Sequence, residues 1–325
     1  MTNLDVAPAE VSCSGRPGVE PQLLTPRLVP LGGPRAMTVR RTLPDRSRSL
    51  VGGWCFADHY GPDDVTGTGG MRVPPHPHTG LQTVSWLFSG EIEHRDSLGS
   101  HALVRPGELN LMTAGHGIAH SEVSTANTTL LHGVQLWVAL PDHARDIAPA
   151  FDRFVPEVVD LGPATWRVFL GSVAGLTSPV TCHSPLLGAE LVLAAGSEIG
   201  IAVDPAFEHG VLVDDGAVLV GGSKVTAAQL AYLPPGAREI RVAALDRPAR
   251  LILLGGEPLG EQIIMWWNFV GRDHDEIVEF RGEWQAELAG TGPVAGAPRF
   301  GVVPGYQGLA LPAPVMPGGR LRPRG

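Results

Sequence analysis

Cysteine is scarce in this chain of 325 residues, which contains three: Cys13, Cys55 and Cys182. They are too few and too far apart for a disulfide framework or for a zinc site built from thiolates. The sequence therefore favours a reducing, cytoplasmic setting. Lysine is nearly absent and the formal net charge is −9, so the overall field of the protein repels the phosphate backbone of a nucleic acid. We expect no direct nucleic-acid binding.

Long apolar runs are missing as well. No apolar stretch reaches the roughly 18 residues that a membrane-spanning helix needs. The N-terminal sequence MTNLDVAPAEVSCSG has neither the basic start nor the apolar centre of a secretory signal. The sequence therefore predicts a soluble protein that does not enter a membrane.

Short strand-like segments dominate what is present. The chain has 42 glycines and 30 prolines, and they separate short runs that are rich in apolar and β-branched residues. One series of runs begins at Met37 and a second near Trp166. Many short strands with regular turns are typical of a small closed barrel or double-sheet roll, which leaves few open strand edges. We predict an all-β protein with two such barrels in tandem.

The two series also repeat each other weakly. VSWLFSG, which ends at Gly90, matches GVLVDDG, which ends at Gly216. ELNLMTAG, which ends at Gly115, matches QLAYLPPG, which ends at Gly236. We therefore divide the chain into an extended N-terminal arm (1–35), a first barrel (36–160), a second barrel (161–288) and a Pro/Gly-rich tail (289–325).

One short helix is expected near the end of the second barrel. Asp273 is a suitable N-cap, and Glu276 follows three residues later. Apolar side chains then recur at helical spacing, at Ile277, Phe280, Trp284 and Leu288. In the extended tail, the isolated aromatic residues Phe300 and Tyr306 could dock on a barrel.

Two pairs of polar residues in the first barrel form a candidate metal site. PHPHTG contains His76 and His78, and AGHGIAHSE contains His120 and Glu122. Residues two apart in a strand face the same side, so each pair can point into the barrel, and neighbouring strands can bring the pairs together. Three imidazole nitrogens and one carboxylate suit Fe(II), Mn(II), Ni(II), Cu(II) or Zn(II) rather than magnesium or calcium. An octahedral metal would keep two further positions open.

Histidines of this kind can also be ordinary polar residues in turns, and the internal repeat provides a control. Counted from the matching glycines, His76 and His78 correspond to Ala202 and Asp204 of the second series. In the same way, His120 and Glu122 correspond to Arg241 and Ala243. The second barrel thus lacks the four ligands, which favours a metal site in the first barrel alone.

Three long segments of the sequence resemble the signature of the pirin family, within the cupin superfamily: PHPHTGLQTVSWLFSGEIEHRDSLGS, RPGELNLMTAGHGIAHSE and GVQLWVALP. The flanking segments LPDRSRSLVGGWCFADHYGP and GGEPLGEQIIMWWNFV also look like pirin sequences, so the resemblance covers roughly residues 36–288. It implies a bicupin whose first barrel holds iron through His76, His78, His120 and Glu122, with a metal-free second barrel.

Some positions depart from the family pattern. Pirins often carry glutamate where this chain has Gln82, and glutamine cannot act as a general base. Glu122 is therefore the one carboxylate that the pattern places on the metal, and it is the candidate base. Ligating imidazoles need hydrogen-bond partners, and His94, His116 and His132 are candidates for that supporting role.

Two functions of different kinds follow from the resemblance. The first is a metal-dependent dioxygenase of the quercetin 2,3-dioxygenase type, which acts on a flavonol or another small enolic or catecholic aromatic substrate. The second is a redox-responsive regulatory protein that binds a transcription factor or a metabolic enzyme, with the Fe(II)/Fe(III) state as the switch. Both functions need the same metal site, so the sequence does not separate them.

Overall fold

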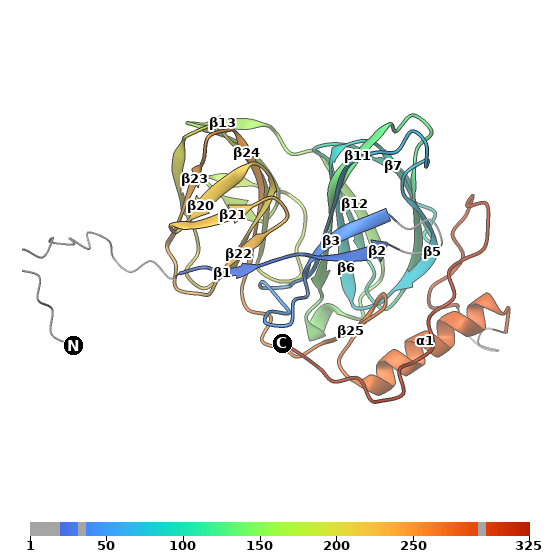
Figure 1. Ribbon diagram of the computed structural model, residues 1–325. Coiled ribbons are helices and arrows are strands. Elements are labelled where there is room, and N and C mark those ends of the chain that lie inside the picture. The colour runs from blue at the N-terminus through green and yellow to red at the C-terminus, as the bar shows by residue number, and fades with distance from the viewer. Residues whose placement is uncertain (1–19, 32–36, 292–296) are drawn as a thin grey trace, which may run out of the picture.

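The computed structural model describes residues 20–31, 37–291 and 297–325, so most of the predicted N-terminal arm lies outside the described part. The described chain consists mainly of β-strands, which form two lobes side by side (Figure 1). Each lobe combines a seven-stranded sheet with a four-stranded sheet. The predicted all-β fold with two tandem barrels is confirmed. Within the described ranges, no helix is long and apolar enough to cross a membrane.

The first barrel contains eleven strands and one short 3-10 helix. Their bounds are β2 Arg27–Leu31, β3 Met37–Leu43, β4 Trp54–Asp64, β5 Arg72–His78, β6 Leu81–Ser89, β7 Ile92–Asp96, β8 His101–Val104, β9 Leu109–Thr113, β10 Ile118–Ser124, β11 Leu130–Ala139, η1 Asp142–Ala144 and β12 Ala150–Phe154. The larger sheet has the order β12-β9-β6-β11-β4-β3-β2, and the smaller one has the order β5-β10-β7-β8.

The second barrel repeats this plan and also takes up the first strand of the chain. Its strands are β1 Gln22–Leu24, β13 Val159–Leu161, β14 Ala164–Leu170, β15 Ser172–Val173, β16 Leu176–Thr177, β17 Leu186–Leu193, β18 Glu198–Ala202, β19 Glu208–Asp215, β20 Ala217–Val220, β21 Ser223–Thr226, β22 Leu230–Leu233, β23 Glu239–Ala244 and β24 Ala249–Gly256. The sheets run β1-β22-β19-β24-β17-β14-β13 and β18-β23-β20-β21, beside the hairpin β15-β16. Because β1 pairs with β22 and β2 with β3, the N-terminal segment ties the two barrels together.

A continuous apolar core joins the two seven-stranded sheets. Trp54 and Trp86 of the first barrel pack in one cluster with Phe169 and Ile252 of the second, and the Trp86 and Phe169 ring centroids are 4.6 Å apart. The indole nitrogen of Trp86 donates a hydrogen bond of 2.7 Å to Glu190 of the other barrel. The outer face of each large sheet is therefore buried against its counterpart.

A hairpin and one helix follow the second barrel and return to the first. The hairpin is β25 Ile264–Trp266 and β26 Phe269–Gly271, and the helix is α1 His274–Leu288, which lies below the first barrel in Figure 1. Asp273 caps α1 by accepting from the backbone nitrogens of residues 275 and 276. The helix is confirmed, with Ile277, Phe280 and Trp284 buried, whereas Leu288 stays 38% exposed because it ends the last turn.

Candidate metal centre

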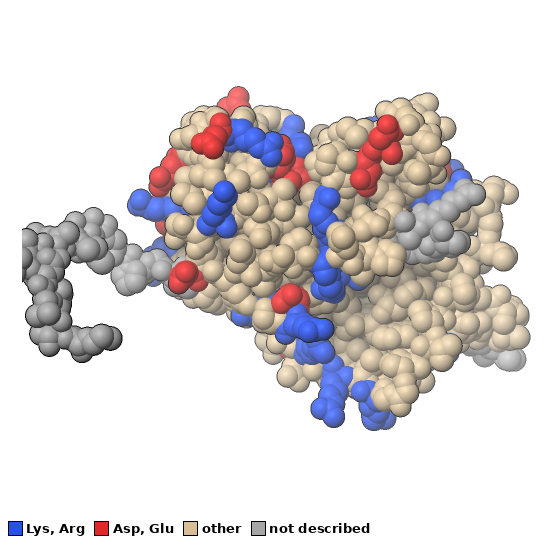
Figure 2. Space-filling view, viewed as in Figure 1, with Lys and Arg blue, Asp and Glu red and all other residues tan. Residues whose placement is uncertain are grey.

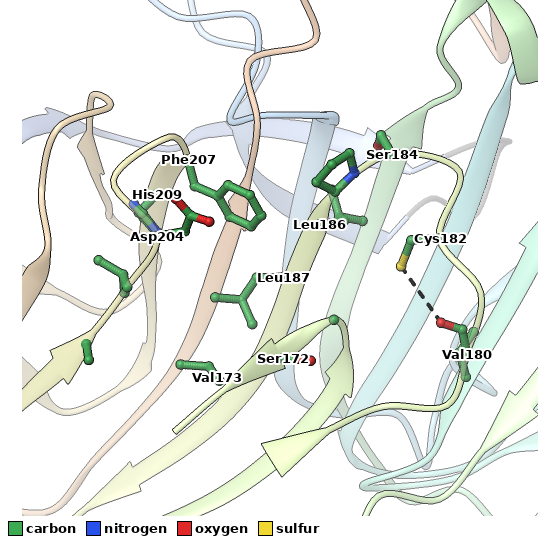
Figure 3. A pocket seen from close by; sticks show the side chains of 14 residues that line it. Ser172, Val173, Val180, Cys182, Ser184, Leu186, Leu187, Asp204, Phe207 and His209 are labelled. Carbon is green, nitrogen blue, oxygen red and sulfur yellow. Dashed lines mark hydrogen bonds between the residues drawn. The ribbon is translucent and has the colours of Figure 1, made fainter. Parts of the chain in front are cut away.

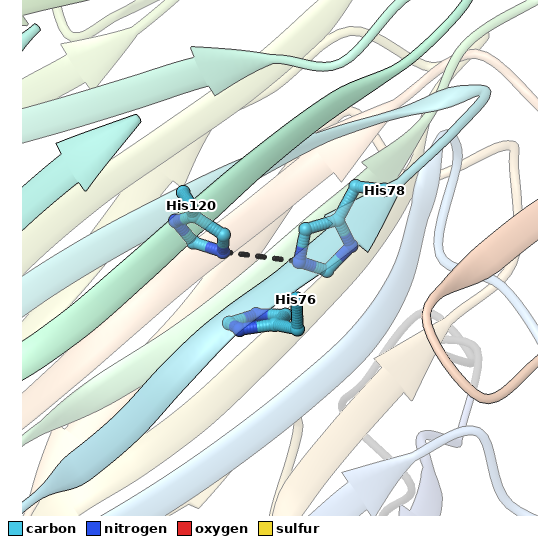
Figure 4. A group of neighbouring side chains, drawn as sticks. All are labelled: His76, His78 and His120. Carbon is cyan, nitrogen blue, oxygen red and sulfur yellow. Dashed lines mark hydrogen bonds between the residues drawn. The ribbon is translucent and has the colours of Figure 1, made fainter. Parts of the chain in front are cut away.

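Two neighbouring strands bring three histidines together inside the first barrel. β5 supplies His76 and His78, and β10 supplies His120, which pairs with His76 in the antiparallel ladder. All three side chains are at least 95% buried. Figure 4 shows their rings turned toward one another. The spacing of two along a strand thus brings these three side chains together as the sequence predicts.

The distances between the rings suit a single small ion. The Nε2 atoms of His78 and His120 are 3.1 Å apart. The ring centroid of His76 lies 4.4 Å from that of His120 and 4.9 Å from that of His78. One nitrogen from each ring lies within 4.8 Å of the other two, so the three rings could hold one metal ion.

Prolines shape the strand that carries His76 and His78. The β5 sequence RVPPHPH contains Pro74, Pro75 and Pro77, which have no N–H to donate to a ladder. The register between β5 and β10 shifts between His120 and Glu122, next to Pro74 and Pro75. Such an irregularity leaves backbone groups free for other partners. One of them, the Pro74 carbonyl, is 2.9 Å from His76 Nδ1.

Backbone carbonyls fix the proton positions of two of these candidate ligands. His76 Nδ1 lies against the Pro74 carbonyl, and His78 Nδ1 lies 3.0 Å from the carbonyl of Asn268 in the β25–β26 turn. A carbonyl only accepts, so each Nδ1 must carry the proton and donate. The neutral rings therefore present an unprotonated Nε2 to the centre of the cluster.

For His120, two hydrogen-bonded side chains in series, His94 and Asp96, fix the position of the ring proton. His94 Nε2 lies 3.3 Å from Asp96 Oδ2 and donates to it, which leaves His94 Nδ1 as an acceptor. This Nδ1 atom is 3.4 Å from His120 Nδ1, so His120 carries its proton there. Its Nε2 is then unprotonated as well. Among the three supporting histidines expected from the sequence, His94 is the one that contacts a ligand.

Burial keeps the three candidate ligands neutral. It lowers the pKa of His76 to about 4, because the charged ring would lose its hydration. The pKa values of His78 and His120 are also lowered well below the ordinary value, first by burial and then by the neighbouring histidines. Neutral imidazole is the form that binds metals.

Glu122 lies in the same cavity but stands slightly apart from the three rings. Its carboxylate is not within the group of nitrogens that share the 4.8 Å limit. It accepts a hydrogen bond of 3.1 Å from the Ser85 hydroxyl, and burial raises its pKa. The buried Tyr60 hydroxyl has no hydrogen-bond partner among the described residues, and burial, followed by the charge of Glu122, raises its pKa. Ligation by Glu122 stays a prediction.

A cavity of about 470 Å³ leads from the histidines to the surface. Its wall includes the stacked rings of Phe56 and Trp137, whose centroids are 4.1 Å apart. Further lining residues are Arg27, Arg41, Gln135, Met265, Trp267 and Asn268. No local pattern in the sequence identifies Arg27, Arg41, Phe56 or Asn268 as part of the site.

The other predicted site residues lie elsewhere. Gln82 donates to Thr113 at 2.8 Å within the large sheet, and His116 Nδ1 contacts the Ile147 carbonyl at 3.1 Å. His132 belongs to a second buried group between the barrels, with His59 and Asp214. Each of these two rings has Nε2 at 2.6 Å from Asp214 Oδ1, a hydrogen-bond distance.

The second barrel has a cavity of its own without a histidine cluster. Ala202 and Asp204, the counterparts of His76 and His78, line a space of about 600 Å³ together with Phe207 and His209 (Figure 3). Among the described residues, no group of three side chains able to hold a metal lies wholly within this barrel. The structure thus repeats the cavity but not the three converging nitrogens.

Two tandem barrels of this kind, with buried histidines at the centre of one, define a bicupin. The pirin family model matches residues 36–138, and the model of the pirin C-terminal cupin domain matches residues 188–289. The chain belongs to the pirin family.

Similar proteins have been named as dioxygenases or as pirins. A Pseudomonas aeruginosa protein with the name putative quercetin 2,3-dioxygenase is 44% identical, over 91% of this chain and 90% of the relative. A pirin-like protein of Caulobacter vibrioides is 36% identical, over 76% and 88% of the two chains. The crystal structure of quercetin 2,3-dioxygenase from Acinetobacter baumannii matches with a TM-score of 0.86 and 39% identity, over 94% and 98% of the two chains.

Proposed function

We propose that this pirin binds one metal ion through His76, His78, His120 and Glu122. The observation that carries the proposal is the convergence of three unprotonated nitrogens, with Nε2 atoms as close as 3.1 Å. Their lone pairs repel one another unless a cation lies between them. Three nitrogens and one carboxylate suit iron, our first choice, and also manganese, nickel, copper or zinc.

We further propose that the loaded protein is a dioxygenase of the quercetin 2,3-dioxygenase type. The names of the Pseudomonas relative and the Acinetobacter structure support this activity. A flavonol would take up dioxygen and release carbon monoxide together with a depside. A metal in this site would lower the pKa of a coordinated hydroxyl group and offer open positions to the substrate and to dioxygen.

The residues of the chain have defined parts in this proposal. Glu122 accepts the proton of the substrate hydroxyl, because it is the one carboxylate among the described residues that line this cavity. Ser85 holds the carboxylate in place at 3.1 Å. The Phe56 and Trp137 rings form an apolar wall on which a flat substrate can lie and from which water is excluded.

Metal analysis tests the binding site before any substrate is chosen. The protein would be loaded anaerobically with Fe(II), desalted and analysed by elemental mass spectrometry beside His76→Ala, Glu122→Ala and the exposed control His101→Ala. We expect about one iron per chain in the wild type and the control, and a large loss in His76→Ala. Equal iron in His76→Ala would overturn the site. If Glu122→Ala loses much less iron than His76→Ala, the Glu122 carboxylate lies outside the ligand set.

Oxygen uptake then tests the reaction. Iron-loaded protein would be mixed with quercetin in an oxygen electrode, with carbon monoxide measured in the gas phase and Glu122→Gln as the comparison. We expect uptake and carbon monoxide in equal amounts, and a rate lower by about 100-fold in Glu122→Gln, the loss typical of a missing general base. An intact iron site that consumes neither quercetin nor oxygen would favour the regulatory alternative. A pull-down comparing the Fe(II) and Fe(III) forms would then be the next test.

A further inference from the structure

The cavity above the candidate metal site changes in character from its floor to its rim. The floor consists of buried histidines, and the wall contains the stacked Phe56 and Trp137 rings. Arg27, an exposed residue of β2, lines the same space. In the view of Figure 2, basic side chains gather over the region where Figure 1 draws β2 and β3. A ligand that reaches from the floor to the rim would therefore meet polar groups, then aromatic faces, then positive charge.

A strained tryptophan forms another part of the wall. Trp267 occupies the β25–β26 turn with φ of 53°, a left-handed conformation that costs a bulky residue on the order of 1–3 kcal/mol. The next residue, Asn268, holds His78 through its carbonyl. Trp267 packs edge-on against Phe269, with centroids 5.4 Å apart, and lines the cavity. A glycine or asparagine at this turn position would relieve the strain. The chain instead has a large aromatic side chain there, which lines the cavity.

Arg27 and Arg41 both line this cavity, but they differ in whether a carboxylate pairs with their positive charge. Arg41 forms two hydrogen bonds of 2.7 Å with Asp58 and lies 4.2 Å over the Phe56 ring. Arg27 donates to the Pro44 carbonyl and makes no ion pair with any carboxylate of the described residues. Partial burial and the nearby Arg41 lower the pKa of Arg27. Asp58 and Asp45 oppose this lowering from a distance, but no carboxylate of the described residues pairs directly with the Arg27 guanidinium.

We propose that this cavity selects flat aromatic ligands that carry a hydroxyl group at the metal end and an anionic group, such as a carboxylate, at the Arg27 end. The inference rests on the proposed function, and it names the substrate class of that site. Trp267, Phe56 and Trp137 position the ring between the two ends. A neutral ligand of the same shape gains the aromatic contacts but not the ion pair with Arg27.

Two probes that differ mainly in charge test this preference. Zinc-loaded protein, which carries out no redox chemistry, would be titrated with 3,4-dihydroxybenzoate and with 3,4-dihydroxybenzamide in a calorimeter. We expect Arg27→Gln to weaken the benzoate about fivefold and to leave the benzamide within about twofold, as a partly exposed ion pair implies. Each probe is compared with itself between wild type and variant. Any difference in how strongly the hydroxyl groups of the two probes bind zinc therefore cancels. Arg46→Gln, an exposed arginine that does not line the cavity, is the matched control.

A second variant separates charge from stacking. Trp267→Leu should weaken both probes by a similar factor of about 2 to 13, because stacking of a ring on an aromatic side chain contributes on the order of 0.5–1.5 kcal/mol. The ratio of the two affinities should remain as in the wild type. Added salt at 0.5 M should reduce the benzoate preference in the wild type and not in Arg27→Gln.

The outcomes separate this inference from the proposed function. Equal effects of Arg27→Gln on both probes would overturn the charge selection, even if iron-loaded protein consumes oxygen. If the charge preference is lost in Arg27→Gln but oxygen uptake is absent, the selection stands and the dioxygenase proposal fails.

Discussion

At the scale of single residues, His120 differs from the other two candidate ligands because a side chain rather than a carbonyl holds its proton. That side chain, His94, is stacked on Phe151 with centroids 4.5 Å apart. His94→Phe would keep the stacking but remove the acceptor, so His120 would be free to change its proton position. We expect zinc affinity, measured by competition with a chelator, to fall by about 10-fold.

The control for this variant is His101→Gln, because His101 is exposed on β8 and pairs with Glu93 rather than with a ligand. Its zinc affinity should equal that of the wild type. An unchanged affinity in His94→Phe would mean that the contact between His94 and His120 does not position the ligand.

His209 is a buried histidine of the second barrel and has a different role. It has no exposed surface, and neither ring nitrogen has a hydrogen-bond partner among the described residues. His209→Leu should therefore raise the free energy of unfolding at pH 7.5 by about 1–2 kcal/mol, measured with urea. A loss of stability in the variant would show that the ring makes a favourable polar contact.

The same variant predicts a dependence on pH. Burial lowers the pKa of folded His209 to about 4, below the 6.5 of an exposed histidine. The unfolded chain therefore takes up a proton first, and wild-type stability falls as pH decreases from about 6.5 to about 4. His209→Leu lacks this contribution, so its advantage over the wild type should grow across that window. A constant difference between pH 7.5 and pH 4.5 would contradict the assignment.

The sequence predicted that the three histidines converge, because strand spacing alone sets which side chains share a face. It could not predict Asn268, which supports His78 from 190 positions away in the chain. Arg27 was missed for the same reason, since a short strand of the N-terminal segment brings it to the cavity. His132 has a position near the ligands in the sequence, but β11 carries its ring to the junction of the barrels.

At the scale of the elements, α1 was predictable because its signals are local. The cap residue Asp273 accepts from the backbone nitrogens of Asp275 at 2.8 Å and Glu276 at 3.0 Å. The strands were predictable as a series, but their pairing was not. The assignment of β1 to the second barrel depends on contacts with β22, more than 200 residues later, and no local pattern encodes them.

Removal of the cap should destabilise α1 without changing the metal site. Asp273→Ala leaves two backbone donors without their acceptor, which should cost about 1 kcal/mol of unfolding free energy in urea. Asp273→Ser, which can still cap, should recover most of this loss. Because α1 packs beneath the hairpin that carries Asn268, zinc affinity serves as the second measurement. A weaker zinc site in Asp273→Ala would mean that the end of the helix also sets the position of the hairpin.

At the scale of the whole molecule, the two barrels share polar as well as apolar contacts. Asp214 of β19 lies between them and accepts from His59 and His132 of the first barrel, each at 2.6 Å. Its other oxygen accepts from Arg250 at 2.6 Å. Arg40 donates to His59 Nδ1 at 3.1 Å, so His59 carries its proton on Nε2 and directs it at Asp214. These contacts form a hydrogen-bonded junction between the barrels.

Asp214→Asn should therefore weaken the junction of the barrels. An amide cannot accept from all three donors, and it leaves the Arg250 charge unpaired, so we expect a loss of about 2–4 kcal/mol in urea unfolding at pH 7. Asp215→Asn is the matched control, because this neighbour is exposed and pairs with Arg247 at the surface. Its effect should stay within about 0.5 kcal/mol.

The pH dependence of the Asp214→Asn effect follows from the charge of the wild-type residue. Burial alone would raise the Asp214 pKa, but the hydrogen bonds from His132 and His59 outweigh burial and hold the pKa well below its usual 3.8. A lowered carboxylate pKa contributes stability that is complete above about pH 4 and is lost as the pH falls further. The difference between wild type and Asp214→Asn should then stay constant from pH 7 to about pH 5 and shrink below pH 4. A difference that already shrinks between pH 7 and pH 5 would contradict the role assigned to the Asp214 carboxylate.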